Sequence, residues 1–225
     1  MALTPRDALP GSVDGPAAVS NGAGGSSPTA GHGPFFAASA KHLTRRFGTF
    51  DILITDAAQA GGEHVVLVRG CIGGATRVLC RVASACLTST ALDSAECDCA
   101  GQISASLRSI SEAGRGVLIY LAQEGRGHGL TTKVRALRHK NRGLDTFQAV
   151  EALGLPVDVR SYEVVQRILQ ELGVVSVSLL TSNPGKATAI ADSGVSVEEV
   201  IPLRVPAPRG ARRHILAKRR RGHLL

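Results

Sequence analysis

Three of the five cysteines lie in one short stretch, CLTSTALDSAECDCAGQ (86–102), where Cys86, Cys97 and Cys99 have the spacing C-x10-C-x-C. A structural zinc site has four protein ligands, whereas a catalytic site has three and leaves the fourth position to a water whose pKa falls toward ~7. A closed site would take its fourth ligand from Cys71, Cys80 or one of the seven histidines. The spacing alone leaves open a catalytic zinc site, a closed one, and buried cysteines without a metal.

Two glycine-containing segments have the composition of anion-binding loops. QEGRGHGL (123–130) carries Glu124, Gly125 and Arg126, and backbone N–H groups exposed by glycine beside an arginine can contact phosphate. LLTSNPGK (179–186) places Thr181 and Lys186 where an anion meets a helix N-terminus. The alternatives are a flexible strand-to-helix loop for the first segment and ordinary helix capping for the second.

A pair of opposite charges, Asp158 and Arg160, lies in PVDVRSY (156–162). In an extended backbone, residues two positions apart point to the same side. The two side chains can therefore act together at a site, and the alternative is a salt bridge on the surface.

These residues need strands and helices to position them, and the hydrophobic pattern predicts both. Short β-branched runs over 50–56, 64–70 and 77–83 are spaced like the strands of a meander. More continuous apolar runs over 116–122 and 174–180 are typical of strands buried on both faces. The fold class is therefore predicted to be α/β, of mixed α+β type: one domain over residues 41–225, with antiparallel strands early, β–α alternation later, and a mixed sheet flanked by helices.

Helices are predicted over residues 102–114, 145–154, 161–173 and 183–194. Asp145 and Gln148 have the spacing of a capping box, and Ser161 is expected to cap the next helix. Asn183 and Pro184 have the positions of an N-cap and a first helical residue.

The two ends of the chain differ in composition from the body. Residues 1–40 are rich in Gly, Ala, Ser and Pro, which predicts a disordered leader. The net charge of the chain is +8. Residues 200–225 carry eight Lys and Arg and no acid, so this C-terminal tail is basic and residues 1–199 have no net charge. We interpret the tail as solvated; phosphate attraction and non-specific polyanion binding are the alternatives.

Several classes of partner are not supported. No apolar run approaches the roughly 20 residues of a membrane span, and no signal peptide is evident. Aromatic residues for base stacking are missing from the basic tail, so we expect no specific nucleic acid as partner. Clustered cysteines without an export signal favour reduced thiols, metal binding and a cytoplasmic location.

Together and in this order, the motifs resemble those of GTP cyclohydrolase II, the first committed enzyme of riboflavin synthesis. The resemblance extends from about Arg46 to Leu225. The matching motifs are R-V-x-S-x-C-L-T, C-D-C, Q-E-G-R-G-x-G-L, K-V-R-A, G-L-D-T, D-x-R-S-Y, L-L-T-S-N-P-x-K and the terminal G-H-L-L.

The resemblance implies a zinc enzyme, usually a homodimer, that hydrolytically opens the imidazole ring of GTP. Formate and pyrophosphate leave, and the product is 2,5-diamino-6-ribosylamino-4(3H)-pyrimidinone 5′-phosphate. The resemblance further implies that Cys86, Cys97 and Cys99 bind Zn²⁺ with the fourth position open to the attacking water. A Mg²⁺ ion is expected with the substrate, because the crowded charge of a triphosphate needs a divalent cation.

The same resemblance suggests roles for other residues. Arg160 matches the residue proposed to attack the α-phosphate, with Asp158 as its acid–base partner; neutralisation of charge by Arg160 is an equal alternative, since guanidinium is nearly always protonated. Glu124 is expected to accept hydrogen bonds from guanine, and Arg126 to pair with phosphate. The residues that match nucleotide contacts are Arg81, Ser84, Gln102, Glu124, Gly125, Arg126, Thr146, Thr181 and Lys186.

The chain departs from the family pattern in three motifs. Ala83 and Ala85 replace the usual His and Glu, and Leu137 replaces a Tyr that is tied to formate release. R-G-H-G replaces the more usual R-N-I-G and introduces His128, which could act as a substitute base. One hypothesis is a divergent cyclohydrolase whose reaction stops at the ring-opened formamido-pyrimidine. The other is a catalytically inactive homologue that binds a nucleotide or polyanion; a zinc-ribbon nucleic-acid binder would need a second cysteine pair that the chain lacks.

Overall fold

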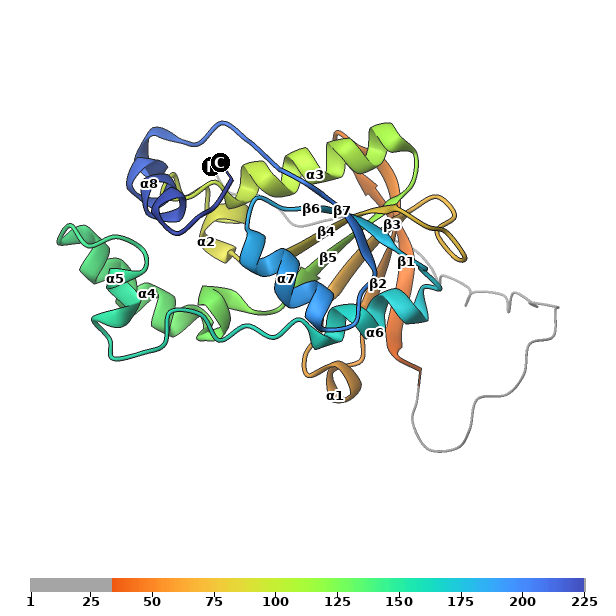
Figure 1. Ribbon diagram of the computed structural model, residues 1–225, viewed down its shortest axis with the longest axis horizontal. Coiled ribbons are helices and arrows are strands. Elements are labelled where there is room, and N and C mark those ends of the chain that lie inside the picture. The colour runs from red at the N-terminus through yellow and green to blue at the C-terminus, as the bar shows by residue number, and fades with distance from the viewer. Residues whose placement is uncertain (1–33, 225) are drawn as a thin grey trace, which may run out of the picture. The chain divides into compact units, whose positions relative to one another are not determined.

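The computed structural model describes residues 34–224, which contain one seven-stranded mixed sheet in the order β1-β2-β3-β5-β4-β6-β7 (Figure 1). The first three strands form an antiparallel meander, and β3 also pairs antiparallel with β5. The pairs β4·β5, β4·β6 and β6·β7 are parallel. The strands are β1 (Phe36–Thr44), β2 (Gly48–Thr55), β3 (Val65–Arg69), β4 (Val78–Ser84), β5 (Gly116–Leu121), β6 (Val177–Leu180) and β7 (Val197–Ile201).

Helices connect the parallel strands and cover both faces of the sheet (Figure 1). The α-helices are α1 (Ala57–Ala60), α2 (Leu87–Thr90), α3 (Cys99–Ala113), α4 (Gly129–Asn141), α5 (Gln148–Glu151), α6 (Glu163–Glu171), α7 (Pro184–Asp192) and α8 (Arg212–Arg220). Two short 3-10 helices are η1 (Glu124–Gly127) and η2 (Arg209–Ala211). No helix among residues 34–224 is both long enough and apolar enough to cross a membrane.

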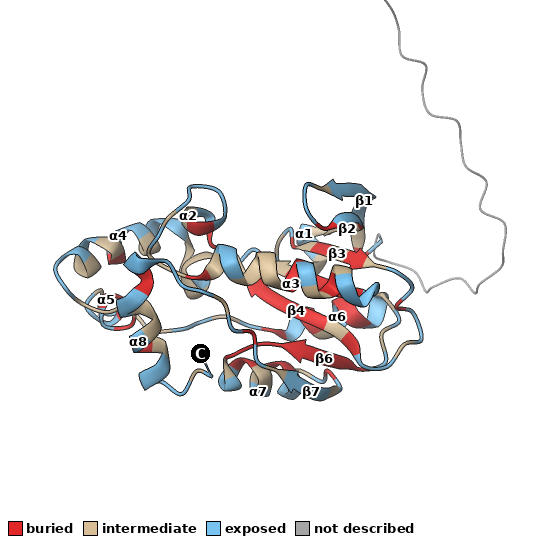
Figure 2. Cartoon of the chain, turned by 90° about the horizontal axis from the view of Figure 1, so that it is seen from above, coloured by how far each residue is buried: buried red, intermediate tan, exposed pale blue. Residues whose placement is uncertain are grey.

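The alternation of side chains along each strand builds two core layers. Val117, Ile119 and Leu121 of β5 pack in the larger cluster with α6 and α7. Leu118, one position out of phase, packs in the smaller cluster with Ile110 of α3. The buried strands stand out in red in Figure 2, whereas much of the surface of α4, α5 and α8 is exposed.

The predicted mixed sheet with flanking helices is confirmed, as are antiparallel pairing early and parallel pairing later. The expected meander over 50–56, 64–70 and 77–83 is wrong at its last strand, because β5 lies between β3 and β4. The reason is α3: a helical crossover makes β4 and β5 parallel neighbours, and a parallel pair cannot be joined by a hairpin. The pattern also missed β1, β7, α4 and α8.

The predicted disordered leader of residues 1–40 lies mostly outside the described residues. Its last residues belong to β1, which begins at Phe36, so the sheet includes residues before the expected boundary at residue 41. Phe35, only 5% exposed, anchors this start in the core and packs edge-on against Phe36.

Local capping agrees with the sequence pattern at Asp145 but not at α6, whose N-cap is Tyr162 and not the expected Ser161. Asp145 Oδ1 accepts from the backbone N–H groups of Phe147 and Gln148, at 2.7 and 2.9 Å, and Gln148 Oε1 accepts from the N–H of Asp145 at 3.0 Å. This is the reciprocal capping box that the spacing predicted. Asn183 has the N-cap position of α7, although its side chain makes no capping hydrogen bond there.

Candidate active site

A cavity of about 250 Å³ lies beyond the carboxyl ends of the parallel strands β4, β5 and β6. Ser84 ends β4, Glu124 follows β5, and Ser182 follows β6, and all three line the cavity. Parallel strands bring their carboxyl ends to one edge of a sheet, which is where open α/β sheets bind their ligands. Segments far apart in sequence therefore meet at this edge.

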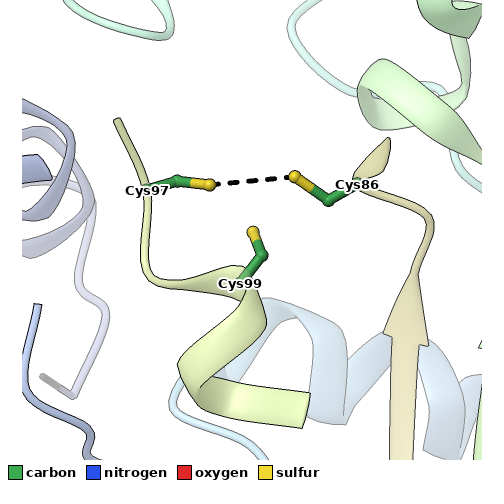
Figure 3. A group of neighbouring side chains, drawn as sticks. All are labelled: Cys86, Cys97 and Cys99. Carbon is green, nitrogen blue, oxygen red and sulfur yellow. Dashed lines mark hydrogen bonds between the residues drawn. The ribbon is translucent and has the colours of Figure 1, made fainter. Parts of the chain in front are cut away.

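The three predicted zinc-binding cysteines meet at the cavity wall. Cys86 precedes α2, while Cys97 and Cys99 flank the N-terminus of α3. Their Sγ atoms all lie within 4.8 Å of one another, and those of Cys86 and Cys97 are 3.7 Å apart. Figure 3 shows the three side chains pointing toward a common centre.

This cluster fits a zinc ion. Tetrahedral zinc with Zn–S bonds of about 2.3 Å places its sulfurs about 3.8 Å apart, close to the spacing of Cys86 and Cys97. No fourth His, Cys, Asp or Glu of residues 34–224 joins the group. Cys80, the nearest alternative in sequence, is buried in the core, where burial raises the pKa of its thiol to about 12. The geometry thus favours three protein ligands over a closed site.

Lys133 of α4 was not among the predicted site residues, yet it contacts both the cysteines and the QEGRG loop. Its Nζ donates to Cys86 Sγ at 3.2 Å and to Glu124 Oε1 at 2.8 Å. Hydrogen bonds from Cys97 and Cys99, together with the charge of Lys133, lower the pKa of the Cys86 thiol. The same cluster raises the pKa of Cys99, first because hydrogen bonds to Cys86 and Cys97 stabilise its protonated thiol, and then through burial and the repulsion of nearby thiolates.

Glu124 is held by its own chain more fully than the sequence suggested. Its Oε2 accepts from the N–H of Leu87 at 2.6 Å, and its Oε1 accepts from Lys133 and from the N–H of Gly125. These bonds fix the orientation of the carboxylate against the start of α2. Arg126 donates to the carbonyl of Thr146 at 3.0 Å, and its guanidinium lies 4.3 Å from the centre of the Phe147 ring.

Asp158 and Arg160 form a bidentate ion pair at the cavity wall. Arg160 Nε donates to Asp158 Oδ1 at 2.8 Å, and its NH1 reaches Ser84 Oγ at 3.3 Å. Burial opposes both charges, but their pairing lowers the pKa of Asp158 and raises that of Arg160. The two residues do form a salt bridge, but this salt bridge lines the cavity and is not the isolated surface pair of the alternative interpretation.

A chain of hydrogen bonds joins β4 to the N-terminus of α3. Arg81 donates to the carbonyl of Leu180 at 2.8 Å and to Gln102 Oε1 at 2.6 Å. Gln102 in turn donates to Asp98 Oδ2 at 2.7 Å, and Lys218 of α8 donates to Asp98 Oδ1 at 2.7 Å. Asp98 lies between two of the clustered cysteines and is 2% exposed, so this chain fixes the segment that carries them.

The buried cations of the cavity are electrostatically strained. Burial, followed by the charges of Arg160 and Arg81, lowers the pKa of Lys186 well below its ordinary value. Burial also lowers the pKa of Arg81 to about 10 and, with the charge of Arg160, lowers that of Arg126. An anionic ligand would relieve this strain, because it stabilises the charged form of every cation around it.

Almost all of the predicted site residues line this cavity, namely Arg81, Ser84, Cys86, Cys97, Cys99, Gln102, Glu124, Gly125, Arg126, Thr146, Asp158, Arg160 and Lys186. Thr181 does not line it: Thr181 is 2% exposed, and its Oγ1 accepts from the N–H of Asn183 at 3.2 Å. Thr181 therefore bonds within the segment before α7, and its hydroxyl caps no N–H group in the first turn of that helix.

Comparison with known proteins identifies the family. Residues 36–202 match the model of the family described as GTP cyclohydrolase II. The chain belongs to the GTP cyclohydrolase II family.

Curated relatives carry the same name. GTP cyclohydrolase-2 of Neisseria meningitidis serogroup B is 45% identical over 166 residues, which cover 73% of this chain and 84% of the relative. That of Histophilus somni is 47% identical over 163 residues, covering 72% and 76%. Among solved structures, a two-domain 3,4-dihydroxy-2-butanone 4-phosphate synthase from A. baumannii has 20% identity and a TM-score of 0.41, over 74% of this chain and 39% of that one.

The departures from the family pattern can now be located. Ala83, Ala85 and Leu137 all line the cavity, so each removes a polar group from it. His128 does not line it: its Nε2 bonds with the carbonyl of Pro156 at 2.7 Å. The suggestion that His128 acts as a substitute base is therefore wrong, because the ring is held away from the cavity.

Sequence reasoning missed the contribution of the C-terminal tail. Our interpretation of the tail as solvated is wrong for three of its residues, His214, Lys218 and His223, which line the cavity, whereas most of its arginines are exposed. The terminal G-H-L-L motif marked His223, and K-V-R-A marked Lys133, but neither motif indicated a contact. The basic residues of the tail differ in what they face, and composition cannot show this.

Proposed function

We propose that this chain is a zinc-dependent hydrolase that opens the imidazole ring of GTP, as the name of its relatives indicates. The observation that carries the proposal is the three-cysteine cluster, without a fourth ligand among residues 34–224, in the wall of a cation-rich cavity. Three thiolates are a catalytic rather than a structural zinc set. Bound there, zinc supplies Lewis-acid activation of a water for attack on the imidazole carbon.

The residues of the chain then have distinct tasks. Glu124, already fixed by Leu87, Lys133 and Gly125, orients the guanine edge through its remaining lone pair, on Oε2. Arg160, held by Asp158 and Ser84, faces the α-phosphate and stabilises the charge that develops as pyrophosphate leaves. Asp158 positions Arg160 and accepts or returns a proton at its carboxylate. We assign further nucleotide contacts to Arg81, Gln102, Gly125, Arg126, Thr146 and Lys186.

Three accompanying proposals follow from the family resemblance. Mg²⁺ accompanies the triphosphate, because the charge of adjacent phosphates favours a divalent ion. The protein is a homodimer that acts in the cytoplasm in riboflavin synthesis or a related specialised pathway. Light scattering of the purified protein tests the dimer directly.

A specific observation favours an early stop in the reaction. Completing formate release requires hydrolysis of a formamide after the ring has opened, and the usual tyrosine is replaced by Leu137 in the cavity wall. The only two tyrosines are elsewhere: Tyr120 accepts from the N–H of Cys86 at 3.1 Å, and Tyr162 is buried. Neither lines the cavity. We infer that pyrophosphate leaves while the formyl group is retained on the product.

Mass analysis of the products after incubation with GTP, zinc and magnesium tests the proposed hydrolase activity and the early stop. We expect stoichiometric pyrophosphate, much less formate and a formamido-pyrimidine product. Leu137→Tyr should raise the ratio of formate to pyrophosphate several-fold, and Leu137→Phe, which adds the ring without the hydroxyl, should not. Stoichiometric formate from the wild type would refute the early stop alone. Unchanged GTP would refute the hydrolase and favour the inactive nucleotide-binding homologue.

A further inference from the structure

The C-terminal segment folds back onto the cavity instead of extending into solvent. After α8, Gly222 adopts a positive φ of +81°, which reverses the chain. The N–H of His223 then bonds to the carbonyl of Lys218 at 3.2 Å, and the N–H of Leu224 bonds to that of Ser182 at 2.8 Å. Figure 2 shows the C-terminal end between α8 and α7.

Three contacts hold this segment to the rest of the site. Lys218 forms the ion pair with buried Asp98. Arg221 pairs with Glu151 of α5 at 2.9 Å, and its guanidinium lies 4.2 Å from the centre of the Phe147 ring. The position of His223 is therefore set from both sides, by α8 before it and by the β6–α7 junction after it.

The side chain of His223 lines the cavity without a partner of its own. Among residues 34–224, His223 bonds through its backbone N–H and not through its ring. Burial, followed by the charges of Lys218, Arg126, His214 and Arg160, lowers its pKa to about 4. The imidazole is thus a free hydrogen-bonding group beside several cations.

The surroundings identify the chemistry that would engage this ring. Leu224 is bonded to Ser182, two residues before the N-terminus of α7, where backbone N–H groups and the helix dipole favour negative charge. Lys186, in the first turn of α7, is buried, and the charge of Arg160, which also lines the cavity, acts on it. The start of α7 and the segment that carries Arg160 therefore both contribute positive charge beside Lys186.

We propose that His223 is a further substrate-binding residue, whose imidazole N–H donates to an oxygen of the phosphate chain of the nucleotide. The C-terminal turn thereby completes the phosphate end of the cavity. This inference rests on the proposed function, since it assumes that the cavity binds a guanine nucleotide. It assigns a task to the terminal G-H-L-L motif, which the zinc, guanine and α-phosphate contacts leave unused.

Steady-state kinetics of the zinc-loaded protein test this inference. We would compare His223→Ala with Arg220→Ala, an exposed position at the end of α8, and measure GTP turnover together with competitive inhibition by pyrophosphate, GMP and guanosine. Losing a hydrogen bond to a charged group should reduce kcat/KM for GTP, and weaken pyrophosphate inhibition, by about tenfold. Inhibition by guanosine should change less than twofold, and GMP shows whether the α-phosphate takes part.

Conservative variants keep the test independent of folding. His223→Asn and His223→Gln each retain an N–H donor, so at least one should recover most of the loss. If His223→Ala weakened inhibition by guanosine and by pyrophosphate equally, or weakened neither, the inference would be overturned. GTP turnover by the wild type would still support the proposed function. A wild-type protein that neither turned over nor bound GTP would overturn the proposed function, and this inference with it.

Discussion

At the scale of single residues, Lys133 connects the three-cysteine cluster to the QEGRG loop. Its side chain is 18% exposed and lies between Cys86 Sγ and Glu124 Oε1. Burial disfavours its charge, but the hydrogen bond to Glu124 and the charge of Cys86 outweigh burial and raise the pKa of Lys133. The ammonium is therefore firmly protonated and stabilises the thiolate form that zinc requires.

Replacing Lys133 by Met should weaken zinc binding by about 10- to 100-fold, because the thiol of Cys86 then competes for a proton without its neighbouring cation. Competition with a chromogenic chelator measures this affinity independently of turnover. Lys140→Met is the matched control: it lies on the same helix and pairs with Glu96. Equal zinc affinity in the two variants would show that Lys133 does not stabilise the thiolate.

At the scale of elements, the turn η1 places strained backbone next to the cavity. Gly125, Arg126 and Gly127 have φ values of 60°, 60° and 92°. A non-glycine residue in this region costs roughly 1–3 kcal/mol, and such strain persists where surrounding contacts impose it. Here the Thr146 and Phe147 contacts hold Arg126, and the N–H of Val159 bonds to the Arg126 carbonyl at 3.1 Å.

Gly127→Ala should destabilise this turn and raise the KM for GTP. An added Cβ would meet Val159 Cγ2 at 2.9 Å, in addition to the cost of positive φ. Gly143→Ala is the control, since its φ of +102° imposes comparable strain but nothing lies within 4 Å of the new Cβ. Thermal denaturation should show the larger loss for Gly127→Ala, and equal losses would mean that Val159 moves aside at little cost.

At the scale of the whole molecule, buried histidines make stability depend on pH. His64 is 3% exposed; its Nδ1 accepts from the N–H of Ala122 at 3.1 Å, and its Nε2 bonds with the carbonyl of Ala60 at 3.2 Å. Burial lowers the pKa of His64, and burial with nearby cations lowers that of His223 to about 4. Both histidines are therefore favoured in the neutral form in the folded chain.

The free energy of unfolding should fall as the pH decreases from about 6.5 toward about 4. In that window the unfolded chain binds protons at these histidines that the folded chain excludes, so stability rises with pH. Urea denaturation of the metal-free protein measures the slope without competition between zinc and protons. His64→Asn, which keeps an acceptor for Ala122, should reduce the slope, with exposed His42→Asn as control. An unchanged slope in His64→Asn would contradict the assignment.

Much of the site could be predicted because its chemistry is encoded in local motifs. The C-x10-C-x-C spacing indicated the three sulfurs that meet, and the pair Asp158 and Arg160 was expected on one side of an extended segment. Thr181 was misplaced because a helix-start pattern fits capping and anion binding equally well. Lys133 and Asp98 were missed because each acts through contacts with residues distant in sequence.

The sequence by itself determined the family, the metal-binding residue types and the alternation of strands and helices, because spacing and hydrophobic period are local properties. Only the tertiary structure decided that β5 lies between β3 and β4, that Cys80 is a core residue, and that the basic tail returns to the cavity. The physical reason is that strand order and burial depend on which distant segments pack together. Whether a charge is solvated or faces a ligand follows from that packing and not from composition.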